Sequence, residues 1–571
     1  MNKHILSTIT FLIITFNCYS QVVYVKQNAT GLNNGSSWQN AYTDLSTAIN
    51  STSSGEIWVS GGTYFPLTDL DEQIPTNPRL KTFKLKPNIA IYGGFSGFET
   101  NLNQRNWVDN QTILSGEIGN PNDLTDNLIH VVSCTYVNLN ENTILDGLII
   151  TKGYATATGY GGGIYVLQTF GGSFKMKNCV IEENYSEGYG GGMYILNSHP
   201  LIENCIFRNN AAYNGGAMEI RSCNATIKEC LFFQNNATGH ALHWGEGGGI
   251  RINQYSSPKI INTSFTNNFA QYKGGGVYNQ SNYNLSFFNN VVSGNQSREG
   301  GALFLNGTSH LINNLLFNNI ASKKGGAVFM DYGGFGKFIN NTIVQNSAGN
   351  YGGGLYINKP APEIVNSVFW NNTSPTGSQI RTFNDVVGWA PSFRYCNIQG
   401  GLSNIASTGN AIVYENNLNI APSFIDANSN NFRLQSNSLL INAGNITVFP
   451  ASWSGATGEI IYFPNTDLDG NQRVVSTIDI GAYEYGSSLN VGQVEKGAFT
   501  IYPNPSNGIF NFSSNIDFDS LSIYNIQGLK VFETFSEQGL TSINLVGYPS
   551  GLYFINFSVE NIIYTYKLII K

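Results

Sequence analysis

Charged side chains are scarce in this chain of 571 residues. They make up 11% of it, whereas about a quarter is usual. The formal net charge is −7, and no run of lysine and arginine is longer than two residues. The charge pattern therefore gives no support for nucleic acid or an anionic membrane as a partner. The hydrophobic fraction of 41% is ample for a folded core and argues against disorder.

Long apolar runs are also missing, except at the start of the chain. Residues 5–16 are apolar, follow a short basic start and precede small and polar residues. This pattern predicts a signal peptide over residues 1–20, cleaved before Gln21 or Val22 and too short to serve as a permanent anchor. Cys18 lacks the small preceding residues of a lipoprotein signal. We expect an exported protein with no transmembrane segment in its mature form.

What the sequence does contain is an internal repeat. Glycine doublets or triplets followed by alternating apolar residues recur at intervals of 25 to 32 residues. Short strands at a fixed period, with no room for helices between them, predict one solenoid coil per repeat. We therefore expect an all-β, right-handed parallel β-helix. The first apolar positions, which should stack in register, are Ile164, Met193, Met218, Ile250, Val277, Leu303, Val328 and Leu355.

A second motif, Asn-x-x-apolar-x-x-Asn, keeps the same period. Asn178 to Asn184 and Asn204 to Asn210 are two examples. Asparagine tolerates left-handed turns, and stacked asparagines could form a hydrogen-bond ladder from coil to coil. Six cysteines remain after cleavage, and three of them, Cys179, Cys205 and Cys230, occupy one repeat column. We expect these to be small buried side chains, although a disulfide between two of them stays open.

The ends of the solenoid depart from the repeat. Residues 22–25 are expected to form a strand, and residues 37–50 an amphipathic helix that caps the first coil. The domain at 21–485 would then include irregular early coils at 55–150 and late coils with longer loops at 376–485. A linker at 486–497 and a small β-sandwich at 498–571 complete the expected organisation.

Several motifs resemble known families. The opening is similar to that of pectate-lyase-like β-helix proteins, and the Gly-Gly-Ala and Phe-x-x-Asn repeats are similar to those of polymorphic outer-membrane proteins. The segment Asp467 to Glu484 resembles the ending called choice-of-anchor Q. These resemblances imply a fold and name no reaction. The motifs behind the first are Val23-Tyr-Val, Gly35-Ser-Ser-Trp38, Ile57-Trp-Val, Gly62-Thr-Tyr64 and Tyr92-Gly-Gly-Phe95.

The last domain resembles a type A sorting domain of type IX secretion. The resemblance implies a host in the Bacteroidota, export to the outer surface or the medium, and the secretion machinery as a partner. It identifies the route and not the activity of the exported part. The motifs, in order, are Tyr502-Pro-Asn-Pro505, Gly508, Ile523-Tyr-Asn-Ile-Gln-Gly528, Pro549-Ser-Gly-Leu-Tyr553 and Lys567-Leu-Ile-Ile-Lys571.

One column of the repeat carries aromatic residues where strand alternation predicts an outward, solvent-facing position. A ladder of this kind would suit stacking on sugar rings, or it could only stabilise neighbouring strands. Glu219 and Arg251 interrupt it in adjacent coils, where their charges could neutralise one another. The candidate ligand-binding residues are Tyr165, Tyr194, Tyr278, Phe304, Phe329 and Tyr356.

The longest repeat interval holds an insertion, Ala237 to Glu246, that is rich in titratable groups. It should lie beside Glu219, Arg221 and Arg251, so these residues are the candidates for catalysis. Glu246 or His243 would act as the base and Arg251 would stabilise charge.

Asp467, Asp469 and Asn471 alternate as in a calcium loop, but Ile478 fills the place of the twelfth-position glutamate. A tight turn is therefore favoured over a calcium site, and no other metal or cofactor is expected. Taken together, we expect a surface protein that acts in adhesion or binds glycans. The alternative is a secreted polysaccharide lyase or glycoside hydrolase.

Overall fold

The computed structural model describes residues 22–571, apart from short stretches at 157–158, 241–242, 282, 333–335, 387, 410, 447–451, 455–459, 463–464, 475–476, 487–498, 515–517, 526–529, 536–540 and 560–561. The predicted signal peptide and nearly all of the predicted linker lie outside the described residues.

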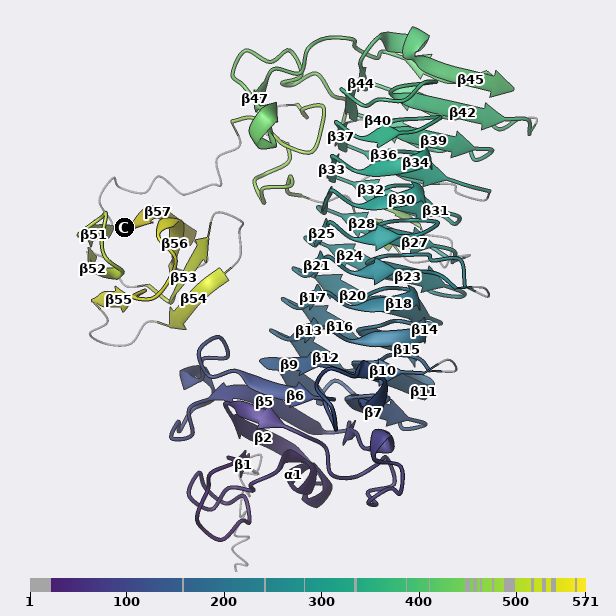
Figure 1. Cartoon of the computed structure of the whole chain (residues 1–571). Coiled ribbons are helices and arrows are strands. Elements are labelled where there is room, and N and C mark those ends of the chain that lie inside the picture. Colours follow the sequence, from purple (N-terminus) through teal and green to yellow (C-terminus); the bar gives the residue numbers. More distant parts are fainter. Residues whose placement is uncertain are drawn as a thin grey trace, which may run out of the picture.

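The body of the chain is a parallel β-helix, as the repeat predicts (Figure 1). Within the described residues its strands pair into four parallel sheets of 14, 12, 12 and 8 strands, here named A, B, C and D. Sheet A runs from β1 (Val22–Val25) to β46 (Val413–Glu415), and sheet B from β3 (Gly62–Tyr64) to β44 (Asn397–Ile398). Each regular coil passes through sheets C, A, B and D in turn.

Sheets C and D position the candidate site. The eight glycine-rich strands stack in sheet C with Ile164 opposite Met193 and Met193 opposite Met218, which confirms the predicted register. Sheet C comprises β4 (Phe83–Lys84), β7 (Val132–Thr135), β11 (Ile164–Gly172), β15 (Met193–Ser198), β19 (Met218–Arg221), β23 (Ile250–Asn253), β27 (Val277–Asn279), β31 (Leu303–Leu305), β35 (Val328–Met330), β39 (Leu355–Asn358), β42 (Ile380–Asn384) and β45 (Ile405–Gly409). Sheet D comprises β10 (Tyr154–Ala155), β14 (Tyr185–Tyr189), β18 (Ala211–Asn214), β22 (Asn236–Ala237), β26 (Phe269–Ala270), β30 (Gln296–Glu299), β34 (Ile320–Lys324) and β38 (Ser347–Ala348).

The asparagine motif performs two tasks at the corners between strands. Its first residue adopts a left-handed conformation, with φ of 52° at both Asn178 and Asn204. Its last residue points into the coil and forms the predicted ladder: Asn268 Nδ2 donates to Asn295 Oδ1 at 2.9 Å, and Asn295 Nδ2 to Asn319 Oδ1 at 3.0 Å. The ladder therefore joins successive coils through buried amides.

The interior is filled by apolar side chains that stack along the axis. Phe232 lies between Phe207 and Phe265, with ring centroids 4.8 and 4.9 Å away. The column of Cys179, Cys205 and Cys230 is buried, and these cysteines are free. Burial raises the pKa of the Cys205 thiol well above its usual value. The prediction of small buried side chains is confirmed.

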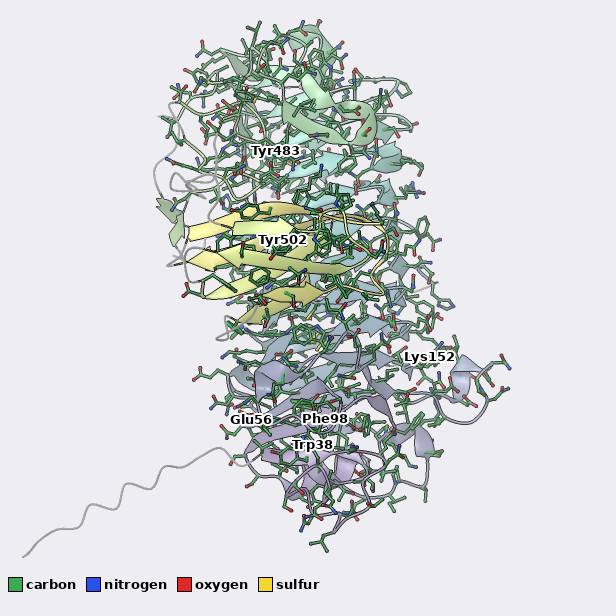
Figure 2. All side chains as sticks on the ribbon, turned by 90° about the vertical axis from the view of Figure 1, so that its left-hand side faces the viewer. Trp38, Glu56, Phe98, Lys152, Tyr483 and Tyr502 are labelled. Atoms are coloured by element: carbon green, nitrogen blue, oxygen red, sulfur yellow. The ribbon has the colours of Figure 1, made fainter. Side chains whose placement is uncertain are left out.

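The N-terminal cap is smaller than predicted. The helix α1 covers only Leu45–Ser51, and Asp44 caps it by accepting a hydrogen bond from the Thr47 amide. Residues before it are drawn into other pairings: the Tyr42 amide donates to the Tyr24 carbonyl at 2.9 Å, so this stretch adds to the edge of β1. Trp38, which is labelled in Figure 2, instead packs with its ring centroid 5.4 Å from that of Phe95.

The C-terminal part of the predicted solenoid is also different. Regular coils end at β46, followed by one parallel bridge of Leu418 to Asn397, and the described residues after that bridge do not form late coils. They begin with an antiparallel hairpin of β47 (Phe424–Asp426) and β48 (Asn431–Leu434), and they then pack against the outer face of sheet B. The Gly481 amide donates to the Asn366 carbonyl at 2.8 Å, and Phe432 and Ile480 join a buried cluster with Val344.

The last domain is a β-sandwich of seven strands in the described part of the chain, as predicted. One sheet holds β51 (Phe499–Tyr502), β52 (Ile509–Ser514) and β55 (Ser542–Asn544). The other holds β54 (Lys530–Phe535), β53 (Ser520–Asn525), β56 (Gly551–Val559) and β57 (Ile562–Ile570). Its core, with Phe510, Ile523 and Phe557, is separate from that of the solenoid. Across the described residues, we find no helix that is long and apolar enough to span a membrane.

Candidate functional site

The predicted aromatic ladder exists, but it does not face solvent. Phe304 lies 4.7 Å from Phe329, and Phe329 lies 4.8 Å from Tyr356, so the rings stack along sheet C outside the main core. Five of the six residues are buried, and Tyr165 is half-buried. The prediction of a solvent-facing column is wrong for Tyr194, Tyr278, Phe304, Phe329 and Tyr356.

The residues directly before two of the glycine turns, Lys273 and Lys324, lie over this ladder, and their side chains are here named the charged roof. Gly274 adopts a left-handed φ of 64°, and the residue before it, Lys273, places its Nζ 4.3 Å from the centre of the Phe304 ring. Two coils further on, Lys324, which directly precedes Gly325, lies 5.2 Å from the Tyr356 ring. Strand alternation shows which side of a strand a residue takes, and it is silent about what covers that side.

The insertion meets the charged residues as the sequence predicts. Arg251 forms two ion pairs, with Glu219 at 2.8 Å and with Glu246 at 3.0 Å. Arg221 reaches the same Oε1 atom of Glu219 at 2.9 Å. Burial would lower the pKa of Arg251, but the two facing carboxylates raise it. Both carboxylates are buried and engaged by arginine, so they are poorly placed to act as a base toward an external substrate.

His243 is held by Asn214 at the edge of this network. Asn214 Oδ1 accepts from the amides of Gly245 and Glu246, at 3.1 and 3.0 Å, which fixes the orientation of the side-chain amide. Asn214 Nδ2 therefore donates to His243 Nδ1 at 3.1 Å, and the ring proton sits on Nε2. Burial and the nearby Arg251 lower the pKa of His243, which favours the neutral ring.

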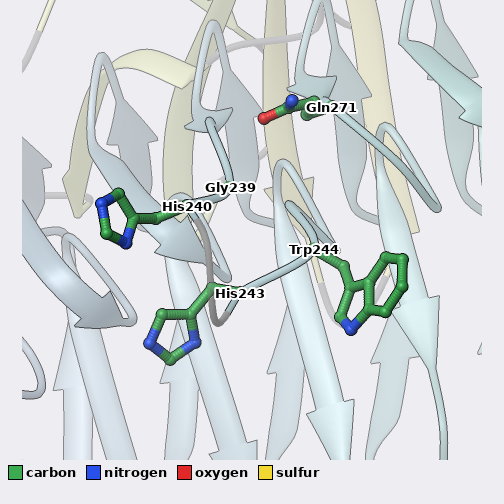
Figure 3. Close-up of a pocket in the computed structure, with 5 residues that line it drawn as sticks. All are labelled: Gly239, His240, His243, Trp244 and Gln271. Carbon is green, nitrogen blue, oxygen red and sulfur yellow. The ribbon is translucent and has the colours of Figure 1, made fainter.

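The insertion also forms an open pocket of about 420 Å³ (Figure 3). It is lined by Gly239, His240, His243, Trp244 and Gln271. The Trp244 side chain is 68% exposed, and its ring lies 5.2 Å from that of Tyr272. The sequence suggests no role for Trp244, whereas the structure exposes its ring at this pocket.

Beside the pocket lies a set of aromatic residues of which the sequence identified only Tyr165 and His243 as candidates. It consists of eight half-buried or exposed rings on and next to sheet D, here named the aromatic belt: Tyr154, Tyr160, Tyr165, Tyr185, Tyr189, Tyr213, His240 and His243.

Ring contacts connect the members of the belt without a break. Tyr160 lies 6.4 Å from Tyr165 and 5.6 Å from Tyr189, and Tyr189 lies 5.0 Å from His243. Tyr213 joins both histidines, at 4.8 and 5.6 Å. A signal was present in the sequence, because Tyr160 and Tyr189 each directly precede a glycine triplet.

The loop with the calcium-like spacing forms a tight turn. Asp467 Oδ1 accepts from the amides of Asp469 and Asn471, at 3.0 and 2.8 Å, and Oδ2 accepts from the Glu484 amide at 2.9 Å. Asp469 is engaged by Arg433, whose Nε lies 2.6 Å away. The Asp467 carboxylate thus organises the backbone. Within the described residues, no three acidic, histidine or cysteine side chains are grouped to hold a metal ion.

Two family models match parts of the chain. Residues 162–321 match the family model of the right-handed beta helix region, and residues 500–571 match that of the secretion system C-terminal sorting domain. The crystal structure of pectate lyase Pel9A is similar over 81% of this chain and 96% of its own, with a TM-score of 0.40 and 17% identity. No curated protein matches the chain. The chain is thus a right-handed parallel β-helix protein with a type IX C-terminal sorting domain, and it is secreted to the cell surface or beyond.

Proposed function

We propose that this secreted protein binds glycans, and thereby mediates adhesion, through the aromatic belt and the adjoining pocket at Trp244. The observation that carries the proposal is the unbroken series of accessible rings from Tyr165 to His243. Sugar rings present flat apolar faces that stack on aromatic side chains, while their hydroxyls seek polar groups at the edges. Tyr and Trp combine such a face with a polar group.

The dimensions of the belt suit an extended chain. It spans four successive coils, β10 to β22, and therefore three coil-to-coil steps. At about 4.8 Å per step the belt is about 14 Å long, which is comparable to a few sugar residues laid along the solenoid axis. Each ring is half-buried or exposed, so part of it is accessible to a ligand.

The buried charged residues take a supporting role in this proposal. Arg251, which also pairs with Glu219, anchors Glu246, and Arg221 pairs with the same Glu219. Asn214 anchors His243, so the C-terminal half of the insertion is fixed beside the belt. They position the insertion and do not contact the glycan. The alternative of a lyase or hydrolase gains no support from this cluster, because its carboxylates are already paired with arginine.

Binding of linear hexasaccharides of glucose, mannose, xylose and galacturonic acid to the mature protein tests the proposal. Replacing Trp244 or Tyr213 by alanine should weaken binding about two- to twelvefold, as expected for the loss of one aromatic stack. Tyr255→Ala is the matched control, since this tyrosine is 59% exposed but lies outside the belt. Failure of all four sugars to bind, or equal affinity in the parent and in the Trp244 and Tyr213 variants, would overturn the proposal.

A further inference from the structure

A second pocket lies at the N-terminal end of the aromatic belt. It has a volume of about 280 Å³ and lies between the segment that joins β3 to β4 and the outer face of sheet C. Leu70, Leu80 and Ile129 supply an apolar wall, and His130 and Tyr165 supply an aromatic one. Its volume is just below the usual range for small-molecule sites, about 300 to 1,000 Å³, so it fits a single ring.

Tyr165 belongs both to this pocket and to the belt. On one side it stacks on His130, with centroids 4.6 Å apart and an angle of 16° between the rings. On the other side it contacts Tyr160, the next ring of the belt, at 6.4 Å. The pocket is therefore a continuation of the belt and not a separate hollow.

The polar groups of the pocket have fixed orientations. His130 Nδ1 lies 2.9 Å from the Gly161 carbonyl oxygen, which can only accept, so Nδ1 carries the proton and Nε2 is left as an acceptor. Burial lowers the pKa of His130 to about 4, which keeps that acceptor available at neutral pH. Arg79 is held by the carbonyls of Asn127 and Tyr154, at 2.7 and 2.9 Å.

Asp69 and Asp71, which carry acceptor oxygens, also line the pocket. Acceptors of this kind, next to an aromatic wall and an apolar one, suit the hydroxyls and the flat face of one sugar ring.

The belt ends at this pocket because the segment at 65–82 is fastened over the first strands of sheet C. Thr82 Oγ1 and Ser133 Oγ are hydrogen-bonded at 2.8 Å. Glu72 pairs with Lys84 and Lys86, at 3.0 and 3.1 Å. A glycan that follows the belt toward the N-terminus thus meets a closed end.

We propose that this pocket holds the terminal residue of the glycan, so that the protein binds chain ends and not chain interiors. The inference rests on the proposed binding at the belt and adds that the site selects for a free end. A chain with its last residue in the pocket would place the next residues on Tyr165, Tyr160 and Tyr189.

Competition between short and long chains tests the inference in the full mature protein. For each hexasaccharide that binds, its parent polysaccharide is added as competitor at equal sugar mass. If ends are bound, the polysaccharide competes in proportion to its molar concentration of ends and is weaker by about the ratio of the chain lengths. Equal competition at equal mass would show that interiors are bound, which would leave the belt proposal intact and overturn this one.

A pocket-filling variant gives an independent measurement. Leu80→Trp should fill the pocket and lower hexasaccharide affinity at least about tenfold, whereas Leu67→Trp, on the same segment but outside the pocket lining, should change it less than about twofold. Leu80 and Leu67 are 48% and 44% exposed, so both variants should retain the parent's melting temperature. Unchanged affinity in Leu80→Trp would overturn the inference, and absence of binding in the parent would overturn both proposals.

Discussion

At the scale of single residues, burial and not strand position decides what the aromatic ladder does. Tyr278, Phe304 and Phe329 occupy outward positions of sheet C, as alternation predicts, yet each is at most 3% exposed. An outward position alone would let these rings be removed with little effect on stability. Because they are buried beneath the charged roof, we expect their removal to destabilise the fold. These rings form a second, smaller core outside the coil.

Phe304→Ala should therefore destabilise the solenoid by about 3–5 kcal/mol, the usual loss for a large ring removed from a packed interior. Chemical denaturation of the parent and the variant measures the difference. Tyr255→Ala, at an exposed ring, should change the free energy of unfolding by less than about 0.5 kcal/mol. Equal stability of Phe304→Ala and the parent would mean that the roof is open in solution.

His130 should make the protein sensitive to mild acid. Its pKa is lowered to about 4 in the folded protein by burial, and it is about 6.5 in an unfolded chain. The unfolded state therefore binds the extra proton first, so the stabilisation is complete above pH 6.5 and is lost as the pH falls toward 4. Melting temperatures at pH 7 and pH 4.5 should differ less in His130→Asn than in the parent. An identical acid loss in both proteins would contradict a buried neutral ring.

At the scale of elements, the sequence predicts the strand register well, but it predicts poorly what packs over the outer face of each sheet. The glycine and asparagine spacings determine the corners, and the corners determine which residues stack, so Ile164, Met193 and Met218 fall in line. The direction of the glycine turn places Lys273 over Phe304, and the alternation of apolar and polar residues along the strand does not predict that direction. The meeting of Glu219, Arg251 and Glu246 was predictable from the repeat, whereas the pairing of both carboxylates with one arginine depends on side-chain geometry.

The sequence contained a sign that the residues after β46 pack against the outer face of sheet B, but a search for alternating apolar and polar residues does not detect it. β33 (Leu315–Phe317) and β41 (Val368–Trp370) are apolar at all three positions, and a strand that is apolar on both faces needs cover on both. One face fills the coil, and the other meets Phe432, Leu434 and Ile480.

The asparagine ladder should be the least replaceable polar element of the solenoid. Asn295 Nδ2 lies within hydrogen-bond distance of the Phe265 and Ser293 carbonyls and of Asn319 Oδ1, so one of its two N–H groups is shared between two acceptors. Its Oδ1 accepts from Asn268. Asn295→Ala removes four partners at once and leaves buried groups unpaired, at a cost of about 1–3 kcal/mol for each. We expect a loss of several kcal/mol in the free energy of unfolding. The exposed Asn267→Ala, in a corner outside the ladder, is the control, and equal losses in the two variants would contradict the role of the ladder.

At the scale of the whole molecule, the solenoid and the domain that directs secretion have separate cores. The solenoid core runs from Val23 to Ile405, and the core of the last domain runs from Phe499 to Ile570. They share no residue, so removal of one should not expose the interior of the other. The sorting domain specifies the route across the outer membrane, and the solenoid presents the aromatic belt to what lies outside.

Deleting residues 499–571 should therefore block secretion without unfolding the solenoid. The truncated protein is expected to accumulate in the periplasm, because the signal that directs passage across the outer membrane is gone while the coils keep all of their own contacts. Immunoblots of periplasm, cell surface and medium measure the location. Circular dichroism and the melting temperature of the periplasmic material measure the fold, which should match that of the solenoid in the secreted parent. Truncated protein in the medium at the parent's level would exclude a sorting role for this domain, and unfolded periplasmic protein would mean that the solenoid depends on the domain. Folded protein held in the periplasm is the one result that requires both the sorting role and the independence of the two cores.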